Sequence, residues 1–159
     1  IVHHVFYRVG MFERFDEFFD HVFRVFEDHR SWRLFPETVS TLTRLKERNL
    51  EIGIISNFDS RLFTVLRGLG IAEAFDTVTI SSLAQAAKPA SQIFHLALEK
   101  HAIDPEEALH IGDSLREDVE GAKKAGLHTA LLDRDGRQQA AGVRTIKNLE
   151  ELFPLLDQL

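Results

Sequence analysis

Short apolar runs alternate with helical patterns across residues 51–132, and no other feature of the sequence constrains the fold as strongly. The run EIGIIS at residues 51–56 has a β-branched apolar centre, which indicates a buried strand. Similar runs occupy residues 76–80, 108–112 and 128–133, and sequences with helical spacing lie between them. This order predicts an α/β fold, namely a doubly wound parallel sheet with helices on both faces.

The segment of residues 13–29 has a strongly helical pattern. Its apolar residues recur at spacings of three and four and therefore share one face: Phe15, Phe18, Phe19, Val22, Phe23 and Phe26. Eight of the 13 phenylalanines precede residue 36, so the aromatic surface is concentrated at this end of the sequence. We expect the stripe to pack either on the chain's own core or on a partner surface that the chain does not contain.

The composition narrows the class of protein. A chain of 159 residues with 44% hydrophobic and 28% charged residues is typical of one globular domain. The net charge is −6 and no basic stripe is present, which argues against nucleic acid as a partner. The absence of cysteine excludes a disulfide framework and a cysteine nucleophile, and it fits a cytoplasmic protein. No apolar stretch reaches the roughly 20 residues that a membrane span requires, so we expect no membrane partner.

Two polar clusters follow predicted strands, at the carboxyl ends where parallel sheets bind ligands. One is SNFD at residues 56–59, the other is GDSLRED at residues 112–118, and Lys88 lies between them in the sequence. The hydroxyl of Ser56, followed by free backbone N–H groups, suits an anionic oxygen. The compact positive charge of Lys88 also suits a phosphate.

Asp113 and Asp118 stand where a predicted strand gives way to a helix. Their carboxylates are hard oxygen ligands that suit Mg²⁺, and Gly112 lets the backbone pass close to a ligand. Taken singly, each residue also has a structural explanation: Ser56 or Asp113 could cap a helix, and Asp118 could be a first-turn acid favoured by the helix dipole. The fixed order of hydroxyl, lysine and paired acids on successive strand–helix units indicates a phosphate-plus-magnesium site.

Three stretches resemble motifs two, three and four of the haloacid dehalogenase-like hydrolase superfamily: GIISNFDSRL, AKP followed by IFHLALEK, and HIGDSLREDVEGAKKAGL. The resemblance runs from about Trp32 to Arg134. It implies a Rossmann-like core and a Mg²⁺-dependent phosphomonoester phosphatase whose substrate is a small phosphorylated molecule.

The resemblance also assigns roles to individual residues. It implies that Ser56, helped by the backbone of Asn57, binds the transferring phosphoryl oxygen. Lys88 would stabilise the charge on the nucleophile and the phosphate. Asp113 would be a magnesium ligand, and Asp118 would support the metal site or orient Lys88.

Motif one of that family, an Asp-x-Asp sequence that carries the nucleophile and the general acid, is not found before the cap-like segment. We therefore expect residues 1–31 to be the C-terminal part of a helical cap and residues 32–159 to be a core without its first strand. The resemblance implies that this strand lies between the strands that end at Ser56 and Gly112. Because neighbouring strands lie about 4.8 Å apart, its loss would leave a gap of about 10 Å or bring the two sides together. We therefore expect that the polypeptide is longer, that another copy of the chain supplies the strand, or that the sheet closes differently, and we favour the first. The resemblance implies an aspartyl-phosphate intermediate in the intact protein, and we expect the 159-residue chain alone to be inactive.

A sequence of Asp-x-Asp form does occur later, in LLDRDGR, which contains Asp133 and Asp135. We interpret it as a polar turn that ends a strand, because no cap follows it. Two other functions stay open: an inactive module of the same fold that binds phosphate or a partner, and a signalling receiver domain. In receivers the acids precede the hydroxyl and the lysine, whereas here Ser56 and Lys88 come first, which argues against that class.

Overall fold

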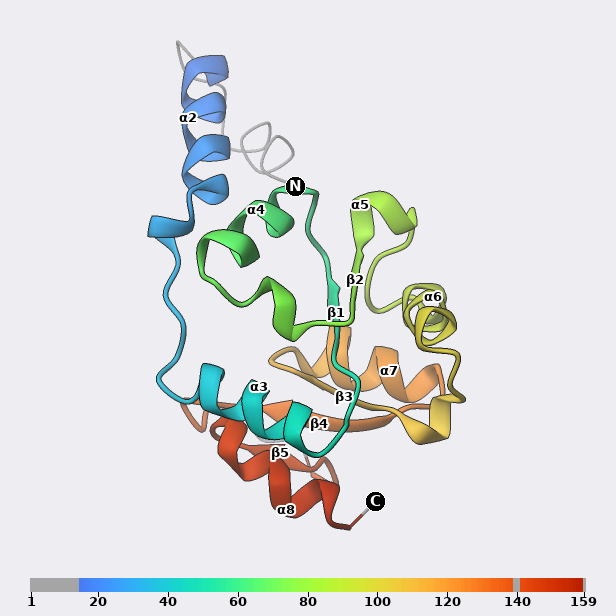
Figure 1. Ribbon diagram of the computed structural model, residues 1–159. Helices are drawn as coiled ribbons and strands as arrows, with labels where there is room; N and C mark the ends of the chain where they lie inside the picture. The colour runs from blue at the N-terminus through green and yellow to red at the C-terminus, as the bar shows by residue number, and fades with distance from the viewer. Residues whose placement is uncertain (1–14, 139–140, 159) are drawn as a thin grey trace.

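The computed structural model describes residues 15–138 and 141–158 and has the predicted α/β architecture, with parallel strands covered by helices (Figure 1). Strands β1 (Gly53–Ser56) and β2 (Thr77–Ile80) form one parallel pair. Strands β3 (Leu109–Gly112), β4 (His128–Leu132) and β5 (Thr145–Ile146) form a second parallel sheet in that order. The four predicted strands are thus confirmed, and β5 adds a fifth that was too short to show a pattern.

The helices largely follow the predicted segments. The α-helices are α2 (Phe15–Glu27), α3 (Thr38–Glu47), α4 (Arg61–Gly68), α5 (Ser81–Ala84), α6 (Ser91–His101), α7 (Gly121–Lys124) and α8 (Leu152–Leu156). The single turns of 3₁₀ helix are η1 (His29–Ser31), η2 (Ala72–Ala74), η3 (Pro105–Glu107) and η5 (Leu149–Glu151).

The helix that we expect at Asp113 and Asp118, after the predicted strand, is divided in two. Its first part, η4 (Leu115–Glu120), is π-helical, and α7 follows. The carbonyl of Ser114 accepts from the backbone N–H of Asp118 at 2.9 Å and from that of Val119 at 3.2 Å. The second of these bonds spans five residues and widens the turn, which the sequence pattern alone did not reveal.

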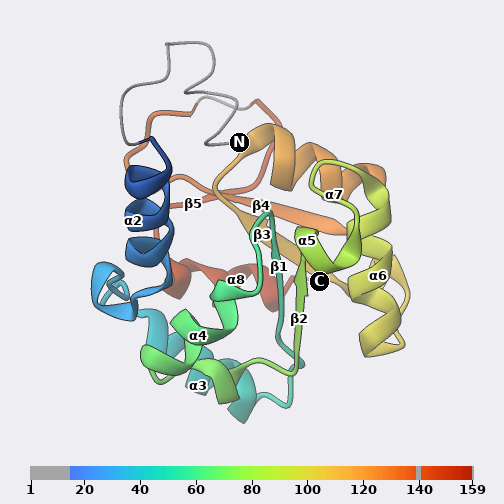
Figure 2. The ribbon, with the colours of Figure 1, turned by 90° about the horizontal axis from the view of Figure 1, so that it is seen from above.

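The two sheets are separate, because no ladder joins β1 to β3 among the described residues. Figures 1 and 2 show β1 and β2 running across the direction of β3 and β4. The expectation of a core without its first strand stays a prediction.

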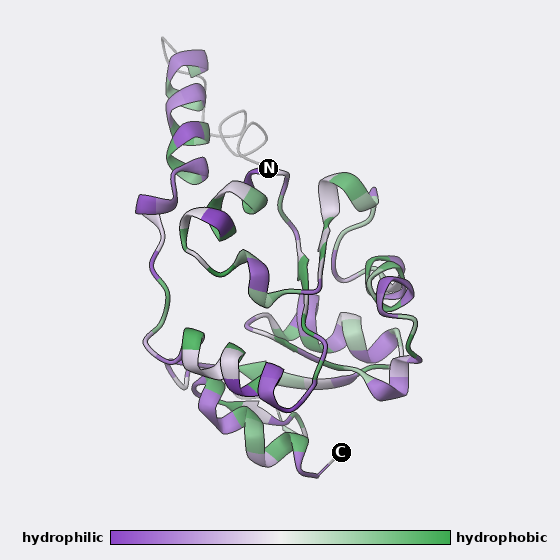
Figure 3. Ribbon diagram, in the orientation of Figure 1, coloured by the Kyte–Doolittle hydropathy of each residue, from purple (hydrophilic) through white to green (hydrophobic). Residues whose placement is uncertain are grey.

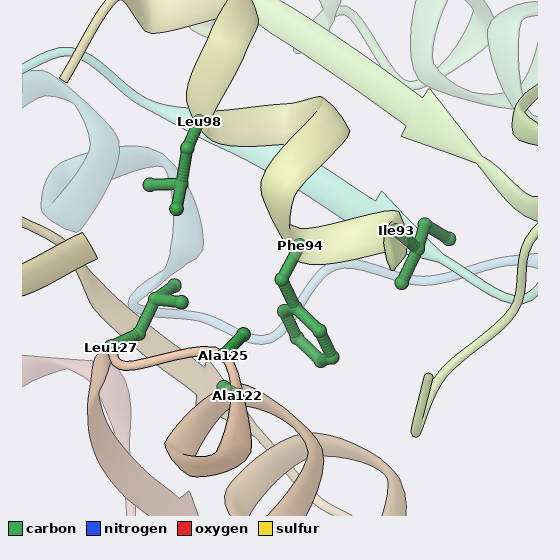
Figure 4. Packing of buried hydrophobic residues seen from close by; sticks show 6 residues of the cluster. All are labelled: Ile93, Phe94, Leu98, Ala122, Ala125 and Leu127. Atoms are coloured by element: carbon green, nitrogen blue, oxygen red, sulfur yellow. The ribbon is translucent and has the colours of Figure 1, made fainter. Parts of the chain in front are cut away.

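Side chains of β1 alternate between two apolar clusters, as the period of a strand requires. Ile54 faces a cluster built on Leu42 of α3 and Leu66 of α4. Ile55 faces the opposite cluster, which α6 and α7 supply and whose buried members are Ile93, Phe94, Leu98, Ala122, Ala125 and Leu127 (Figure 4). Helix α6 therefore packs on β1 and on α7 at the same time.

A third cluster joins α3 to the second sheet. Leu45 of α3 packs with Leu152 and Phe153 of α8, and Leu109 and Ile111 of β3 contact this group. His110, between them in β3, must point to the other face, where its ring lies edge-on to Phe94 with 5.1 Å between centroids. The alternation in β3 thus directs His110 toward the side that carries the polar residues described below.

Helix α2 extends from the body of the molecule (Figure 1) and carries one apolar and one polar face (Figure 3). Phe15 is buried, whereas Phe23 and Phe26 remain 41% and 45% exposed. The division into a cap over residues 1–31 and a core over residues 32–159 stays a prediction, and residues 1–14 of that range lie outside the described residues. None of the described helices has the length and apolar content to cross a membrane.

Candidate functional site

The loops after β1 and β3 and the loop that leads into α6 meet at one edge of the fold. Lys88, from the α5–α6 loop, places its Nζ 2.5 Å from Oδ1 of Asp118 in η4. The lysine and aspartate side chains are 12% and 4% exposed, so this ion pair is largely shielded from water. The structure therefore joins two of the site residues that the sequence predicted.

Both carboxylate oxygens of Asp118 have hydrogen-bond partners within the protein. Its Oδ1 also lies 3.0 Å from Nε2 of His110, and its Oδ2 accepts from the backbone N–H of Ser114 at 3.0 Å. Burial raises the pKa of Asp118, but the hydrogen bonds from His110 and Lys88 outweigh it and hold the pKa well below the usual range. The group is therefore a carboxylate at neutral pH.

Gly112 is required by this arrangement. A Cβ at Gly112 would lie 2.1 Å from Cγ of Asp118, so any side chain there would displace the carboxylate. The group that approaches Gly112 is thus a side chain of the same chain, and the close approach to a ligand stays a prediction.

Asn57 connects the loop after β1 to Lys88. Its Oδ1 accepts from the backbone N–H of Lys88 at 2.8 Å, and its Nδ2 donates to the backbone carbonyl of Lys88 at 3.0 Å. Nδ2 also lies 3.3 Å from Oε2 of Glu117. Ser56, the preceding residue, ends β1 opposite Ile80 of β2 and is half-buried.

Asp113 differs from Asp118 in its exposure and in its hydrogen bonding. It is exposed, and within the described residues its carboxylate oxygens make no hydrogen bond or ion pair, so they are available to a cation. Its backbone carbonyl accepts from Nε2 of Gln138 at 2.8 Å. Ser114, not Asp113, caps the following helix, since its Oγ accepts from the N–H of Glu117 at 3.1 Å.

The donor set fits Mg²⁺ only in part. Mg²⁺ takes one or two protein carboxylates and keeps several waters, and Asp113 offers one such carboxylate at the carboxyl end of β3. The oxygens of Asp118 already serve Lys88, His110 and Ser114. Across residues 15–138 and 141–158, no three His, Cys, Asp or Glu side chains are grouped as a metal site.

The later Asp-x-Asp sequence is a turn, as interpreted. Asp133 is 6% exposed, and its two oxygens accept from the backbone N–H groups of Arg137 and Gln138 at 3.1 and 2.8 Å. Asp135 is exposed and pairs with Arg137 at 3.4 Å. Neither carboxylate takes part in the Lys88–Asp118 network.

Sequence reasoning missed two contributors to the site: His110 and the side chain of Asn57. His110 lies in a strand pattern, which by itself indicates a structural residue. Its position two residues before Gly112 was the available signal, since residues two apart in a strand share a face. The Asn57 contacts join positions 31 apart, and no local pattern encodes them.

Comparisons with known proteins identify the family of the chain. The sequence profile of the haloacid dehalogenase-like hydrolases matches residues 8–126. A bovine (Bos taurus) protein, haloacid dehalogenase-like hydrolase domain-containing protein 3, is 33% identical over 146 residues, which are 88% of this chain and 58% of that protein. Phosphoserine phosphatase of Thermus thermophilus is 32% identical over 132 residues, or 80% of this chain and 53% of that enzyme.

A solved structure supports the same assignment. The crystal structure of a HAD phosphatase from Thermococcus onnurineus superposes with a TM-score of 0.77 and 29% identity, covering 80% of this chain and 60% of that one. The chain thus spans little more than half the length of these relatives. Its motifs, its fold and the profile match agree, and the chain belongs to the haloacid dehalogenase-like hydrolases.

Proposed function

We propose that the intact protein is a Mg²⁺-dependent phosphomonoester hydrolase that acts on a small phosphorylated molecule. The observation that carries the proposal is the shielded Lys88–Asp118 pair, tied through Asn57 to the loop that bears Ser56. Two of the similar proteins are phosphatases by name, which supports phosphate ester hydrolysis over other hydrolase chemistry.

The residues of the chain would act on the phosphoryl group from one side. In this proposal the Ser56 hydroxyl and the Asn57 N–H donate to a phosphoryl oxygen, and Lys88 neutralises charge that develops in the transition state. Asp113 holds Mg²⁺, which when bound supplies positive charge to the phosphoryl oxygens. Asp118 and His110 keep the Lys88 ammonium in place rather than ligating the metal, because both oxygens of Asp118 and Nε2 of His110 are already paired.

The nucleophile has to come from elsewhere. Hydrolysis through an aspartyl-phosphate needs a carboxylate in line with the leaving group, and Asp133, the buried acid of the later Asp-x-Asp sequence, is occupied by its own turn. We propose that an Asp-x-Asp strand outside these 159 residues lies between β1 and β3, where the two sheets are not joined. The chain alone would then bind phosphate without turning it over.

The test is hydrolysis of p-nitrophenyl phosphate with Mg²⁺, by the 159-residue chain and by the polypeptide with an upstream Asp-x-Asp segment restored. We expect turnover only in the second. In that polypeptide Lys88→Ala should lower kcat by about 10²–10³-fold, the usual loss when a charge-stabilising group is removed. Asp113→Asn should raise the Mg²⁺ concentration needed for half-maximal activity. A restored protein that binds inorganic phosphate and never turns over would instead establish the inactive module.

A further inference from the structure

We infer that the side-chain amide of Asn57 is a positioning residue that fixes the backbone of Lys88, and through it the ammonium group that meets the phosphate. This role rests on the proposed phosphohydrolase function and adds to it. The backbone of Asn57 was assigned to phosphate binding by family resemblance, whereas the role proposed here belongs to its side chain.

The geometry of the contact is reciprocal. One amide side chain both accepts from the N–H of Lys88 at 2.8 Å and donates to the carbonyl of the same residue at 3.0 Å. A strand partner satisfies a residue in the same two-point manner in a β-ladder. The two bonds hold the peptide groups on both sides of the Lys88 Cα, so they fix the orientation of the residue as well as its position, which a single bond would not do.

Fixing the backbone matters because the Lys88 side chain is long and flexible. Its far end is held by Asp118 at 2.5 Å, and its near end is held by Asn57. Asn57 follows β1 of the first sheet, whereas Asp118 belongs to η4, which follows β3 of the second. Lys88 is therefore held from both halves of the fold, and releasing either end would let Nζ move relative to Ser56.

The residue type at position 57 is specific to this task. Aspartate would accept from the N–H of Lys88 but could not donate to its carbonyl, and leucine could do neither. The second amide proton of Asn57 faces Oε2 of Glu117 at 3.3 Å, so a carboxylate at position 57 would also meet a like charge. Both replacements preserve approximate size and remove the two-point contact.

The first measurement is amide hydrogen exchange, which does not depend on turnover. In Asn57→Leu we expect the exchange rate of the Lys88 N–H to rise at least tenfold. In Asn57→Asp, which keeps the acceptor, the rate should rise less. Exchange at the buried Phe94 should stay unchanged, since that amide reports global unfolding. Gln92→Leu, on the exposed surface of α6, is the matched control that loses an amide with no effect at Lys88.

The second measurement is kinetic and uses the intact polypeptide. Asn57→Leu should lower kcat by about 10–100-fold, since a displacement of about 1 Å in a catalytic group has effects of that size. In a Lys88→Arg background, where the cation is already displaced, the same change should cost less than threefold, because residues that act through one another are not additive.

The outcomes separate the two proposals. Unchanged exchange at Lys88 in both Asn57 variants, or fully additive losses with Lys88→Arg, would overturn the positioning role. An intact polypeptide that never hydrolyses p-nitrophenyl phosphate would overturn the proposed function instead. The exchange at Lys88 would then decide alone whether Asn57 fixes this residue.

Discussion

Helices α2 and α6 both carry apolar faces, yet they end in opposite surroundings. On α6, Ile93 and Phe94 are fully buried, at 0% exposure. On α2, which has the more regular aromatic stripe, Phe23 and Phe26 stay more than 40% exposed. The contrast shows that helical periodicity identifies an apolar face without specifying how much of it is covered.

The burial of the two helices differs because different elements pack against them. Phe94 contacts His110 of β3, and the α6 cluster includes Ala122 of α7 and Ala125, which directly follows α7. Among the described residues, helix α2 contacts Arg61 of α4, whose guanidinium carbon lies 3.6 Å from the centroid of the Phe23 ring. The stability of the described fold should accordingly depend on α6 much more than on α2.

The largest expected effect is at Phe94. We predict that Phe94→Ala lowers the free energy of unfolding by about 3–5 kcal/mol, the usual cost of emptying a fully buried aromatic site. Phe26→Ala, which removes the same ring from the exposed side of α2, should cost less than about 1 kcal/mol. Urea unfolding monitored by circular dichroism measures both. Equal losses would show that α2 is as integral to the fold as α6.

The same contrast between buried and exposed groups applies to two lysine–aspartate pairs. Lys88–Asp118 and Lys46–Asp76 both have 2.5 Å between nitrogen and oxygen, but the second pair is 36% and 37% exposed. Lys88→Met should cost about 3 kcal/mol, because it leaves a buried carboxylate without its cation. Lys46→Met should cost no more than about 1 kcal/mol. A cost at Lys88 as small as that at Lys46 would show that His110 and Ser114 suffice for Asp118.

The parts of the fold that the sequence predicts are those with local patterns. Strands β1 to β4 and the helices around them were predictable because their patterns are local. The capping box of Asp104 and Glu107, which opens η3, is likewise a local pattern of four residues. Helix α5 and strand β5 have four and two residues, too few for a periodicity to show.

The site was less predictable than the fold. The polar residues at the strand ends were identified, and Lys88 and Asp118 indeed meet. Which acid would remain available to a metal could not be deduced, because that depends on His110 and Lys88 converging on Asp118 from positions 8 and 30 residues away. Such convergence is a product of tertiary packing, which no local pattern records.

Asp133 and Asp135, two residues apart in one turn, show the same contrast between a buried and an exposed group on a smaller scale. Asp133→Asn should cost about 1–3 kcal/mol, because an amide can accept only one of the two backbone N–H groups of Arg137 and Gln138. Asp135→Asn should change stability by less than about 0.5 kcal/mol, since its side chain is 63% exposed. Thermal unfolding of both variants measures the difference, and a neutral Asp133→Asn would contradict the assigned role of the turn.

The smallest expected effect concerns the attachment of α2. Arg61 is held by a two-pronged contact with Asp59, at 2.8 and 2.6 Å, and donates to the carbonyl of Phe23 at 2.9 Å. The hydrogen bond from Arg61 lowers the pKa of Asp59 below its ordinary value of 3.8. A lowered pKa means that the carboxylate stabilises the fold above pH 3.8 and that this contribution is lost as the pH falls through the folded-state pKa.

Asp59→Asn should therefore reduce the free energy of unfolding by less than about 1 kcal/mol at pH 5–7, since the pair is partly exposed and screened by solvent. The difference from the unchanged protein should shrink steadily below pH 3.8. At 1 M NaCl the neutral-pH difference should also diminish, because salt screens exposed charges. A difference that persists at pH 2 and high salt would mean that Asp59 holds the start of α4 through the backbone N–H of Arg61. The Asp59–Arg61 ion pair would then not be what attaches α2 to α4, and the cation–π contact between Arg61 and Phe23 would be the main attachment of α2.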